Sequence, residues 1–202
     1  MFFEPNKGHP FRHNPFKAVV APRPIGWIAT RSTDGRENLS PYSFFNAVSD
    51  EPPIVMFSSG GEKDSLTFAR ESGCFVAHSA PETMFEAMNQ SSATYPRGVS
   101  EIAATGLRVD DAKLVNAPRL VDAPSALECV VTQIIQPIGQ DGEKSSYFMI
   151  FGEVVGVHIH DDFITKEGRF DSNRAALMAR CGYADYAVAR EIEPKPRPKP
   201  IP

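Results

Sequence analysis

The sequence has few of the residues that mark disulfide frameworks, zinc sites or membrane anchors. Its three cysteines, Cys74, Cys129 and Cys181, are scattered over 202 residues without a CxxC pair, which argues against a disulfide framework or a zinc site. Such free cysteines are most simply small buried residues in a reducing cytosol. No apolar run approaches the roughly 20 residues that span a bilayer, and the first ten residues do not resemble a signal peptide. We therefore expect a soluble cytoplasmic protein with no membrane partner.

Positive charge and familiar catalytic motifs are also scarce. The chain has 21 Lys and Arg against 25 Asp and Glu, a net charge of −4, so no nucleic-acid partner is predicted. There is no GxSxG elbow, no HExxH helix and no Walker loop. His158 and His160 share one face of a strand end and precede Asp161 and Asp162, but no third ligand is suitably spaced. We interpret them as a solvated turn and predict no metal site.

What the chain does have is the composition of an ordinary globular protein, 42% hydrophobic and 23% charged. Residues 1–14 are polar, and residues 191–202 alternate proline with charge, which favours an extended tail. No internal repeat or domain boundary interrupts the part between them. We therefore expect an N-terminal arm over 1–14, one domain over 15–190 and a Pro-rich tail over 191–202.

Strand signals dominate this domain. Alternating or apolar runs predict strands over 23–32, 39–48, 52–59, 74–79, 126–138 and 145–160. The pair Asp34-Gly35 is a hairpin signal between the first two runs, and "GQDGEK" joins the last two into a long antiparallel hairpin. The run over 52–59 is apolar until its final serines, which is typical of a strand buried on both faces.

Three short helices are predicted, over 65–72, 79–90 and 171–182. Asp64 is placed to cap the first, and Gly73 follows its end. Ser79 and Glu82 have the spacing of a capping box for the second. Because βα units do not alternate along the chain, the pattern favours an antiparallel barrel or sandwich with added helices over a doubly wound parallel sheet.

One polar stretch could hold a phosphate. Serine hydroxyls, glycine amides, a lysine and a helix start follow the strand over 52–59, and together such groups can bind a dianion. A polar loop between a strand and a helix accounts for the same residues equally well. The residues concerned are Ser58, Ser59, Lys63, Asp64 and Ser65.

A second stretch suits a planar ring. Trp27, the only tryptophan, lies on the strand that the Asp34-Gly35 turn pairs with residues 40–48. Aromatic and small polar side chains together can stack and hydrogen-bond such a ring. The alternative is that these aromatics belong to the core. Phe44 and Phe45 are adjacent and point to opposite faces of a strand, so at least one should be core.

Several segments, in this order, resemble one family. They are "RPIGWIAT", "DGRENLSPYSFFNAVSDEPPIVMFSS", "KDS", "YPRGVSEIAATGL", "SALECVVTQI" and "FGEVVGVHI". The chain resembles the flavin reductase-like, FMN-binding split-barrel proteins, which include flavoredoxin, over residues 15–187, most specifically over 38–53. The resemblance implies a mainly β fold: a six-stranded antiparallel split β-barrel with Greek-key topology and a few peripheral α-helices. It also implies a homodimer with FMN sites at or near the subunit interface.

The resemblance further implies a function and a site. FMN would accept hydride from NADH or NADPH and pass electrons to a small-molecule acceptor or a partner oxygenase, with His158 as the candidate catalytic residue close to the flavin and the nicotinamide. The loop over 91–106, which shorter flavin reductases lack, would cover the ring and favour FMN as a bound prosthetic group. Residues implied to bind FMN are Trp27, Ser40, Pro41, Tyr42, Ser43, Phe44, Phe45 and Asn46 for the ring and ribityl chain, and Ser58, Ser59, Lys63, Asp64 and Ser65 for the phosphate.

Two other functions stay open at this point. A non-catalytic FMN-binding electron carrier or flavin sensor would bind the cofactor without oxidising NAD(P)H. A flavin-free split barrel would serve as a scaffold or bind haem, with His78 or His158 as the axial ligand.

Overall fold

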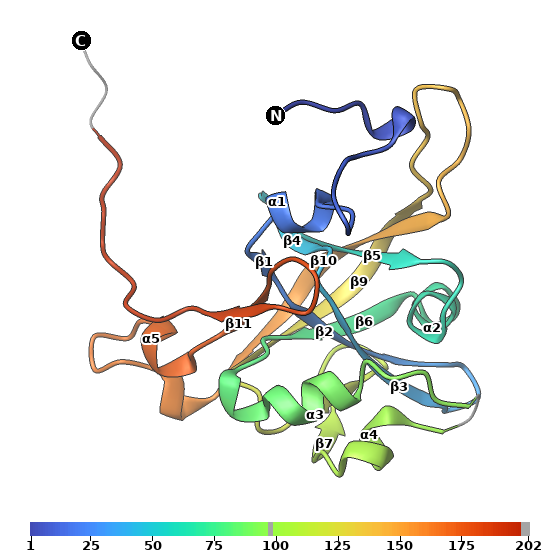
Figure 1. Ribbon diagram of the computed structural model, residues 1–202. Helices are drawn as coiled ribbons and strands as arrows, with labels where there is room; N and C mark the ends of the chain where they lie inside the picture. The colour runs from blue at the N-terminus through green and yellow to red at the C-terminus, as the bar shows by residue number, and fades with distance from the viewer. Residues whose placement is uncertain (97–98, 199–202) are drawn as a thin grey trace.

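One curled antiparallel sheet organises the protein (Figure 1). The structure, a computed structural model, describes residues 1–96 and 99–198, so the end of the predicted Pro-rich tail lies outside the described residues. The sheet has seven strands in the order β3-β2-β6-β9-β10-β5-β4. These strands are β2 (Gly26–Arg31), β3 (Glu37–Tyr42), β4 (Phe45–Asp50), β5 (Pro53–Gly60), β6 (Cys74–His78), β9 (Ser125–Ile135) and β10 (Tyr147–Ile159).

The connection between β3 and β4 closes the sheet on itself. The two strands are the opposite edges of the sheet, yet only Ser43 and Phe44 separate them along the chain. A sheet whose edges are tied by two residues must curl until those edges meet, and the result is a split barrel. Gly26 of β2 makes room for this closure, because a Cβ atom there would lie 2.4 Å from the Phe45 ring.

This connection corrects the prediction of one strand over 39–48 and adds a strand to the expected barrel. β3 pairs with β2, and β4 pairs with β5. Pro41 in β3 has no N–H to donate and lies opposite Trp27 on an edge strand, where proline is tolerated. We call residues 43–44 the crossover. The sheet therefore has seven strands, because the predicted strand is two strands on opposite edges.

The long hairpin of β9 and β10 is confirmed, and so is the turn at Asp34-Gly35, where Gly35 has φ +87°. β5 differs from its prediction as a strand buried on both faces. Val55, Phe57 and Ser59 are buried, whereas Met56 and Ser58 between them are half-buried. The two faces differ because one points into the barrel and the other points outward.

The core has two parts, one on each face of β2. Ile28 points into the barrel with Phe57, Phe75 and Ile150, and the Phe57 and Phe75 rings meet edge to face at 5.1 Å. Trp27 points the other way, toward the outer layer that α3 and α4 form (Figure 1). β2 is therefore buried on both faces.

Shorter elements surround the sheet. The helices are α1 (Phe16–Val19), α2 (Asp64–Ser72), α3 (Phe85–Gln90), α4 (Glu101–Thr105) and α5 (Ser172–Ala175), with 3-10 turns η1 (Pro5–Lys7), η2 (Glu82–Met84) and η3 (Asp161–Phe163). Two small sheets add β1 (Arg23–Pro24), β11 (Met178–Arg180) and β12 (Tyr186–Val188), and β7 (Val109–Asp111) with β8 (Pro118–Leu120).

The helix ends depart from the predicted caps. α2 ends at left-handed Gly73 as predicted, but Asp64 is its first residue and Lys63 occupies the N-cap without a side-chain bond. The capping box is wrong, because the Ser79 hydroxyl bonds Ser125 instead.

The third predicted helix stops after one turn. Asp171 does cap it by accepting a hydrogen bond from the Arg174 N–H, but Ala176 turns left-handed at φ +44°. The following residues then enter β11, whose pairing with β1 and β12 satisfies their backbone.

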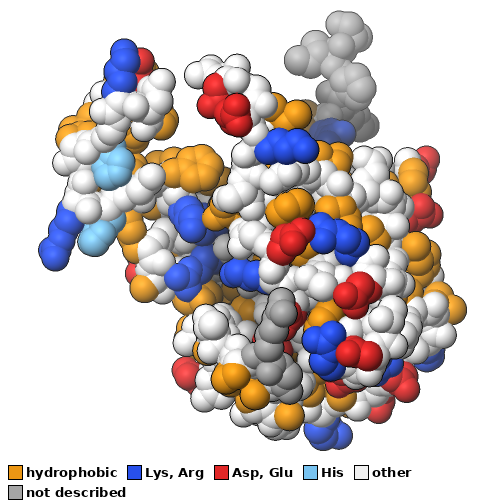
Figure 2. Space-filling view, turned by 90° about the vertical axis from the view of Figure 1, so that its right-hand side faces the viewer, with side chains coloured by type: hydrophobic (Ala, Val, Ile, Leu, Met, Phe, Trp, Pro, Cys, Tyr) orange, Lys and Arg blue, Asp and Glu red, His pale blue; other side chains and the backbone are white. Residues whose placement is uncertain are grey.

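Charge is mixed over the surface. On the face shown in Figure 2, acidic and basic side chains lie interspersed, with smaller apolar areas between them. None of the helices in the described residues is long and apolar enough to cross a bilayer.

Candidate functional site

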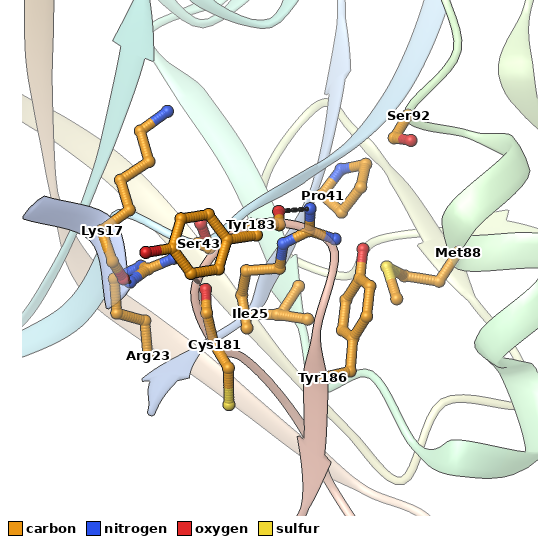
Figure 3. Close-up of a pocket in the computed structure, with 11 residues that line it drawn as sticks. Lys17, Arg23, Ile25, Pro41, Ser43, Met88, Ser92, Cys181, Tyr183 and Tyr186 are labelled. Carbon is orange, nitrogen blue, oxygen red and sulfur yellow. Dashed lines mark hydrogen bonds between the residues drawn. The ribbon is translucent and has the colours of Figure 1, made fainter. Parts of the chain in front are cut away.

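A groove of about 280 Å³ lies against the crossover between β3 and β4. Pro41 and Ser43 contribute to its wall, and the C-terminal strands close it from the other side. Figure 3 shows Lys17, Arg23 and Tyr183 on one side of the groove and Tyr186, Met88 and Ser92 on the other. We call this space the groove.

A shallower space of about 500 Å³ adjoins the groove. It runs along residues 19–24 and is lined by Phe44, Phe45 and Asn46 from the crossover and β4. Arg23 and Ser43 line both spaces, so the two are neighbours. We call the larger space the hollow. The structure thus brings together Pro41, Ser43, Phe44, Phe45 and Asn46 of the predicted ring-binding residues.

The crossover residues, which line these spaces, have unused hydrogen-bond donors. Neither the Ser43 nor the Phe44 N–H donates to any other described residue, while the Phe44 carbonyl accepts from the Ser58 N–H at 2.8 Å. Backbone amides that are free beside a cavity can recognise the polar edge of a ring.

Arg23 is the most unusual group in the groove, because its charge is buried without a carboxylate. Only 7% of the residue is exposed. Its guanidinium donates to the carbonyls of Lys17, Val20 and Cys181, and its Nε finds no partner. The guanidinium also lies 5.8 Å from the Phe44 ring centre. A buried cation with one open donor is costly unless an anion or another acceptor completes it.

The predicted phosphate residues fall into two groups. The Ser59 and Ser65 hydroxyls are fully buried and donate to the Gly61 carbonyl at 3.0 Å and to Asn38 Oδ1 at 2.5 Å. Both hydroxyls are therefore engaged within the protein, and their assignment to the FMN phosphate stays a prediction.

Lys63 and Ser58 remain available. Lys63 is exposed, Ser58 is half-buried, and the first amides of α2 have no side-chain cap, which leaves donors open at a helix N-terminus. β5 connects this end of α2 to the crossover through the Ser58–Phe44 hydrogen bond. Asp64 is half-buried and lines a different cavity, next to Glu101.

Tyr42 and Ser40 lie within β3 instead of at the cavities. Burial raises the pKa of Tyr42, against the lowering effect of hydrogen bonds with Ser65 and Ser59. Ser40 is half-buried opposite Ile28 and lines neither the groove nor the hollow.

Glu101 was missed by the sequence predictions. Its carboxylate accepts from Asn38 Nδ2 at 3.1 Å and from the Leu39 N–H at 3.2 Å, and burial raises its pKa. The residue belongs to α4, within the loop over 91–106, so it ties that loop to β3. An acid at a helix start is common, and no sequence signal distinguished this one.

Trp27 does not reach either cavity. Its side chain is fully buried, and its Nε1 donates to the Ser91 hydroxyl at 2.9 Å. Trp27 therefore belongs to the core, which is the alternative that the sequence left open, and its place near a flavin stays a prediction. The reason is that β2 has a covered outer face, which a strand pattern alone does not reveal.

His158 is likewise placed away from the groove and the hollow. Its Nε2 lies 2.5 Å from a carboxylate oxygen of Glu128, which also accepts from the N–H groups of Lys113 and Leu114. Burial acts to raise the pKa of Glu128, but these hydrogen bonds together lower it. Within one chain, His158 holds β10 to the loop at 113–114.

His78 has both ring nitrogens engaged. Nδ1 lies 2.9 Å from the Trp27 carbonyl and Nε2 lies 2.9 Å from the Leu120 N–H. A carbonyl only accepts and an N–H only donates, so the ring is the neutral tautomer with its proton on Nδ1. Binding a haem iron would break one of these bonds, which argues against His78 as an axial ligand.

Comparisons with known proteins identify the family. Residues 20–179 match the family model described as "Flavin reductase like domain", so the chain belongs to the flavin reductase-like family. An uncharacterized protein of Halalkalibacterium halodurans is 33% identical over 185 residues, covering 89% of this chain and 88% of the relative. Membership makes the protein a flavin-related oxidoreductase or electron carrier.

Three solved structures extend the comparison. Nitrilotriacetate monooxygenase component B from Bacillus cereus superposes with a TM-score of 0.86 at 26% identity, over 96% of this chain and 98% of that one. The 2-nitrobenzoate 2-nitroreductase of Pseudomonas fluorescens gives a TM-score of 0.80 at 26% identity, over 93% and 90%. A Shewanella frigidimarina protein described as having a "split barrel domain" superposes with a TM-score of 0.80 at 18% identity, over 91% of this chain and 90% of that one, which confirms the split-barrel prediction.

The buried neutral His78 makes stability depend on pH. Burial lowers its pKa to about 4, from a usual value of 6.5. Between these values the unfolded chain binds a proton that the folded chain excludes, so stability falls as the pH drops from about 6.5 toward 4. From pH 7 to pH 5 we expect the free energy of unfolding to fall by about 2 kcal/mol from this residue.

Urea unfolding monitored by the fluorescence of buried Trp27 measures this free energy at each pH. The His78→Gln variant, which cannot titrate there, should be less stable overall but show a flatter profile over the same window. Identical slopes for the variant and the wild type would mean that His78 is not the group responsible.

Proposed function

We propose that the protein is an oxidoreductase with FMN as its prosthetic group, which oxidises NADH or NADPH and reduces a small-molecule acceptor or a partner oxygenase. The observation that carries this proposal is the crossover. In it, free amides of Ser43 and Phe44 lie beside an aromatic ring and the unpartnered Nε of buried Arg23. These are the groups that a planar, hydrogen-bonding and anionic cofactor requires.

The residues that would hold FMN follow one path. The amides of Ser43 and Phe44 would meet the polar edge of the ring in the hollow. Ser58, bonded to Phe44, leads along the end of β5 to Lys63 and the uncapped start of α2, which suit the phosphate. Ser59 and Ser65 would hold the loop and the helix start in place through their hydrogen bonds to Gly61 and Asn38. When bound, FMN supplies the hydride and electron chemistry.

Neither cavity contains a histidine or a carboxylate among the described residues. Hydride transfer does not require a protein acid or base, so the chain's own work is to bind, orient and exclude water. His158 would act on the nicotinamide only if assembly brought it near a flavin of another subunit. The names of two of the structural relatives, one a monooxygenase component and one a nitroreductase, support a partner oxygenase or a small nitro compound as the acceptor.

Binding of FMN is the first test. The purified protein should be yellow or should bind added FMN with a micromolar Kd, measured by quenching of flavin fluorescence. Lys63→Ala should weaken FMN binding about tenfold, because a charge-assisted phosphate contact is lost, while its unfolding midpoint stays unchanged.

Lys166→Ala removes another exposed lysine and serves as the control. An equal FMN affinity in Lys63→Ala would remove Lys63 from the phosphate site. A colourless protein that does not quench FMN would overturn the proposed function itself.

Reduction by a nicotinamide separates an enzyme from a carrier. Anaerobic stopped-flow mixing of the FMN-loaded protein with NADH and with NADPH should bleach the visible absorption of the flavin within seconds with at least one donor (about 1 s⁻¹ or faster). A flavin that both donors leave oxidised, but dithionite reduces, would identify the non-catalytic carrier.

We also propose a homodimer. Three apolar side chains near the end of β10 are exposed: Val155, Val157 and Ile159, by 41%, 63% and 40%. Leu114, 66% exposed, lies beside Gly156, which points to the opposite face of β10 from Val157. Light scattering should give twice the chain mass, and Val157→Asp should shift the protein toward monomer by burying an unpaired charge. A wild-type monomer at micromolar concentration would contradict this proposal.

A further inference from the structure

Three cations surround the groove and leave its charge unbalanced. Lys17, Arg23 and Arg180 all line it, and among the described residues none of them lies within ion-pairing distance of a carboxylate. Arg31 offers a contrast, because Glu37 and Asp111 hold it at 2.7 and 2.6 Å. A partly enclosed set of cations without counter-ions favours an anion from solution.

Flat and apolar surfaces accompany these charges. The Arg180 guanidinium lies 4.3 Å from the Tyr186 ring centre and donates to the Tyr183 carbonyl at 2.7 Å. Ile25 and Met88 add apolar wall. Stacking and hydrogen bonding together fix the plane of the guanidinium, which prepares it for a carboxylate.

The backbone also holds one of these rings in an unusual position. Tyr183 has φ +56°, a left-handed conformation that non-glycine residues adopt at a cost and that is enriched at functional sites. His13 of the N-terminal arm lies against the outer side of Tyr183, with 5.9 Å between the ring centres.

Size and position restrict the ligand. A volume of about 280 Å³ is at the lower end of small-molecule sites, which suits a single substituted ring and excludes a dinucleotide. Because Arg23 and Ser43 line both the groove and the hollow, a molecule in the groove would lie next to one in the hollow.

We propose that the groove binds a small aromatic carboxylate, the second substrate of this site, with its carboxylate at Arg180 and Lys17 and its ring beside Tyr186. The role as a substrate rests on the proposed function, since it places this molecule against FMN in the hollow. The binding site itself does not depend on FMN. The carboxylate of this molecule would also bind at a different place from the FMN phosphate, which we assign to Lys63.

Isothermal titration of the full chain with benzoate tests the site, with benzamide as the uncharged isostere. Benzoate should bind at least tenfold more tightly than benzamide, and Arg180→Gln should weaken benzoate binding about tenfold. Arg180→Lys, which keeps the charge but loses the planar fork, should recover part of the loss. Arg174→Gln is the matched control, because Arg174 lies over another aromatic ring, Phe163, at 5.9 Å and should leave benzoate binding unchanged.

Titrations with FMN and riboflavin identify the anion. Arg180→Gln should leave both affinities within twofold of the wild type. If it weakens FMN but not riboflavin, the groove holds the flavin phosphate and the proposal is overturned. Equal binding of benzoate and benzamide, or no effect of Arg180→Gln on benzoate, also overturns it. If benzoate binds through Arg180 but FMN does not bind at all, the groove stands and the proposed function fails.

Discussion

The two-residue crossover is the constraint on which the rest of the structure depends. Ser43 and Phe44 tie β3 at one edge of the sheet to β4 at the other. The sheet can satisfy this tie only by curling, and the bare Cα of Gly26 lets the Phe45 ring pass close to β2. Two consecutive residues within a strand of a barrel would normally have their backbone N–H groups hydrogen-bonded to neighbouring strands. Here the chain is changing edges, so the amides of Ser43 and Phe44 stay free beside the groove and the hollow.

The polar groups on the two sides of the crossover differ in whether they are paired. Toward the barrel and α2, the hydroxyls and amides are paired with one another: Ser65 with Asn38, and Asn38 with Glu101. Toward the outside, Arg23 is buried without a carboxylate and keeps an open Nε. A satisfied network is rigid and an unsatisfied cation attracts an anion. The side of the crossover with unpaired groups is therefore the side that we assign to ligands, and the paired side is its support.

Much of the fold was readable from local pattern. Alternation and turn residues predicted the β9–β10 hairpin and the Asp34-Gly35 hairpin, because both depend on neighbours in the chain. The departures share another cause. Residues 171–182 look helical, but pairing with β1 recruits β11, and residues 39–48 alternate like one strand although their two halves pair with different partners. Local propensity does not report which strand a segment pairs with, whether the partner is close in the chain, as β2 and β5 are, or more than a hundred residues away, as β1 is from β11.

The candidate site was also partly predictable from the sequence and partly not. Residue order and side-chain chemistry were enough to predict the family and the strand-rich class, both confirmed, and to direct attention to residues 38–53. Only the tertiary structure decided which of these residues have free groups: Trp27, Ser59 and Ser65 are buried and engaged, whereas Ser43 and Phe44 face cavities. It alone brought Lys17 and Arg23 to Arg180, since strand pairing between β1 and β11 joins the two ends of the domain. Exposure and convergence are properties of packing, and packing is set by contacts that are distant in the chain.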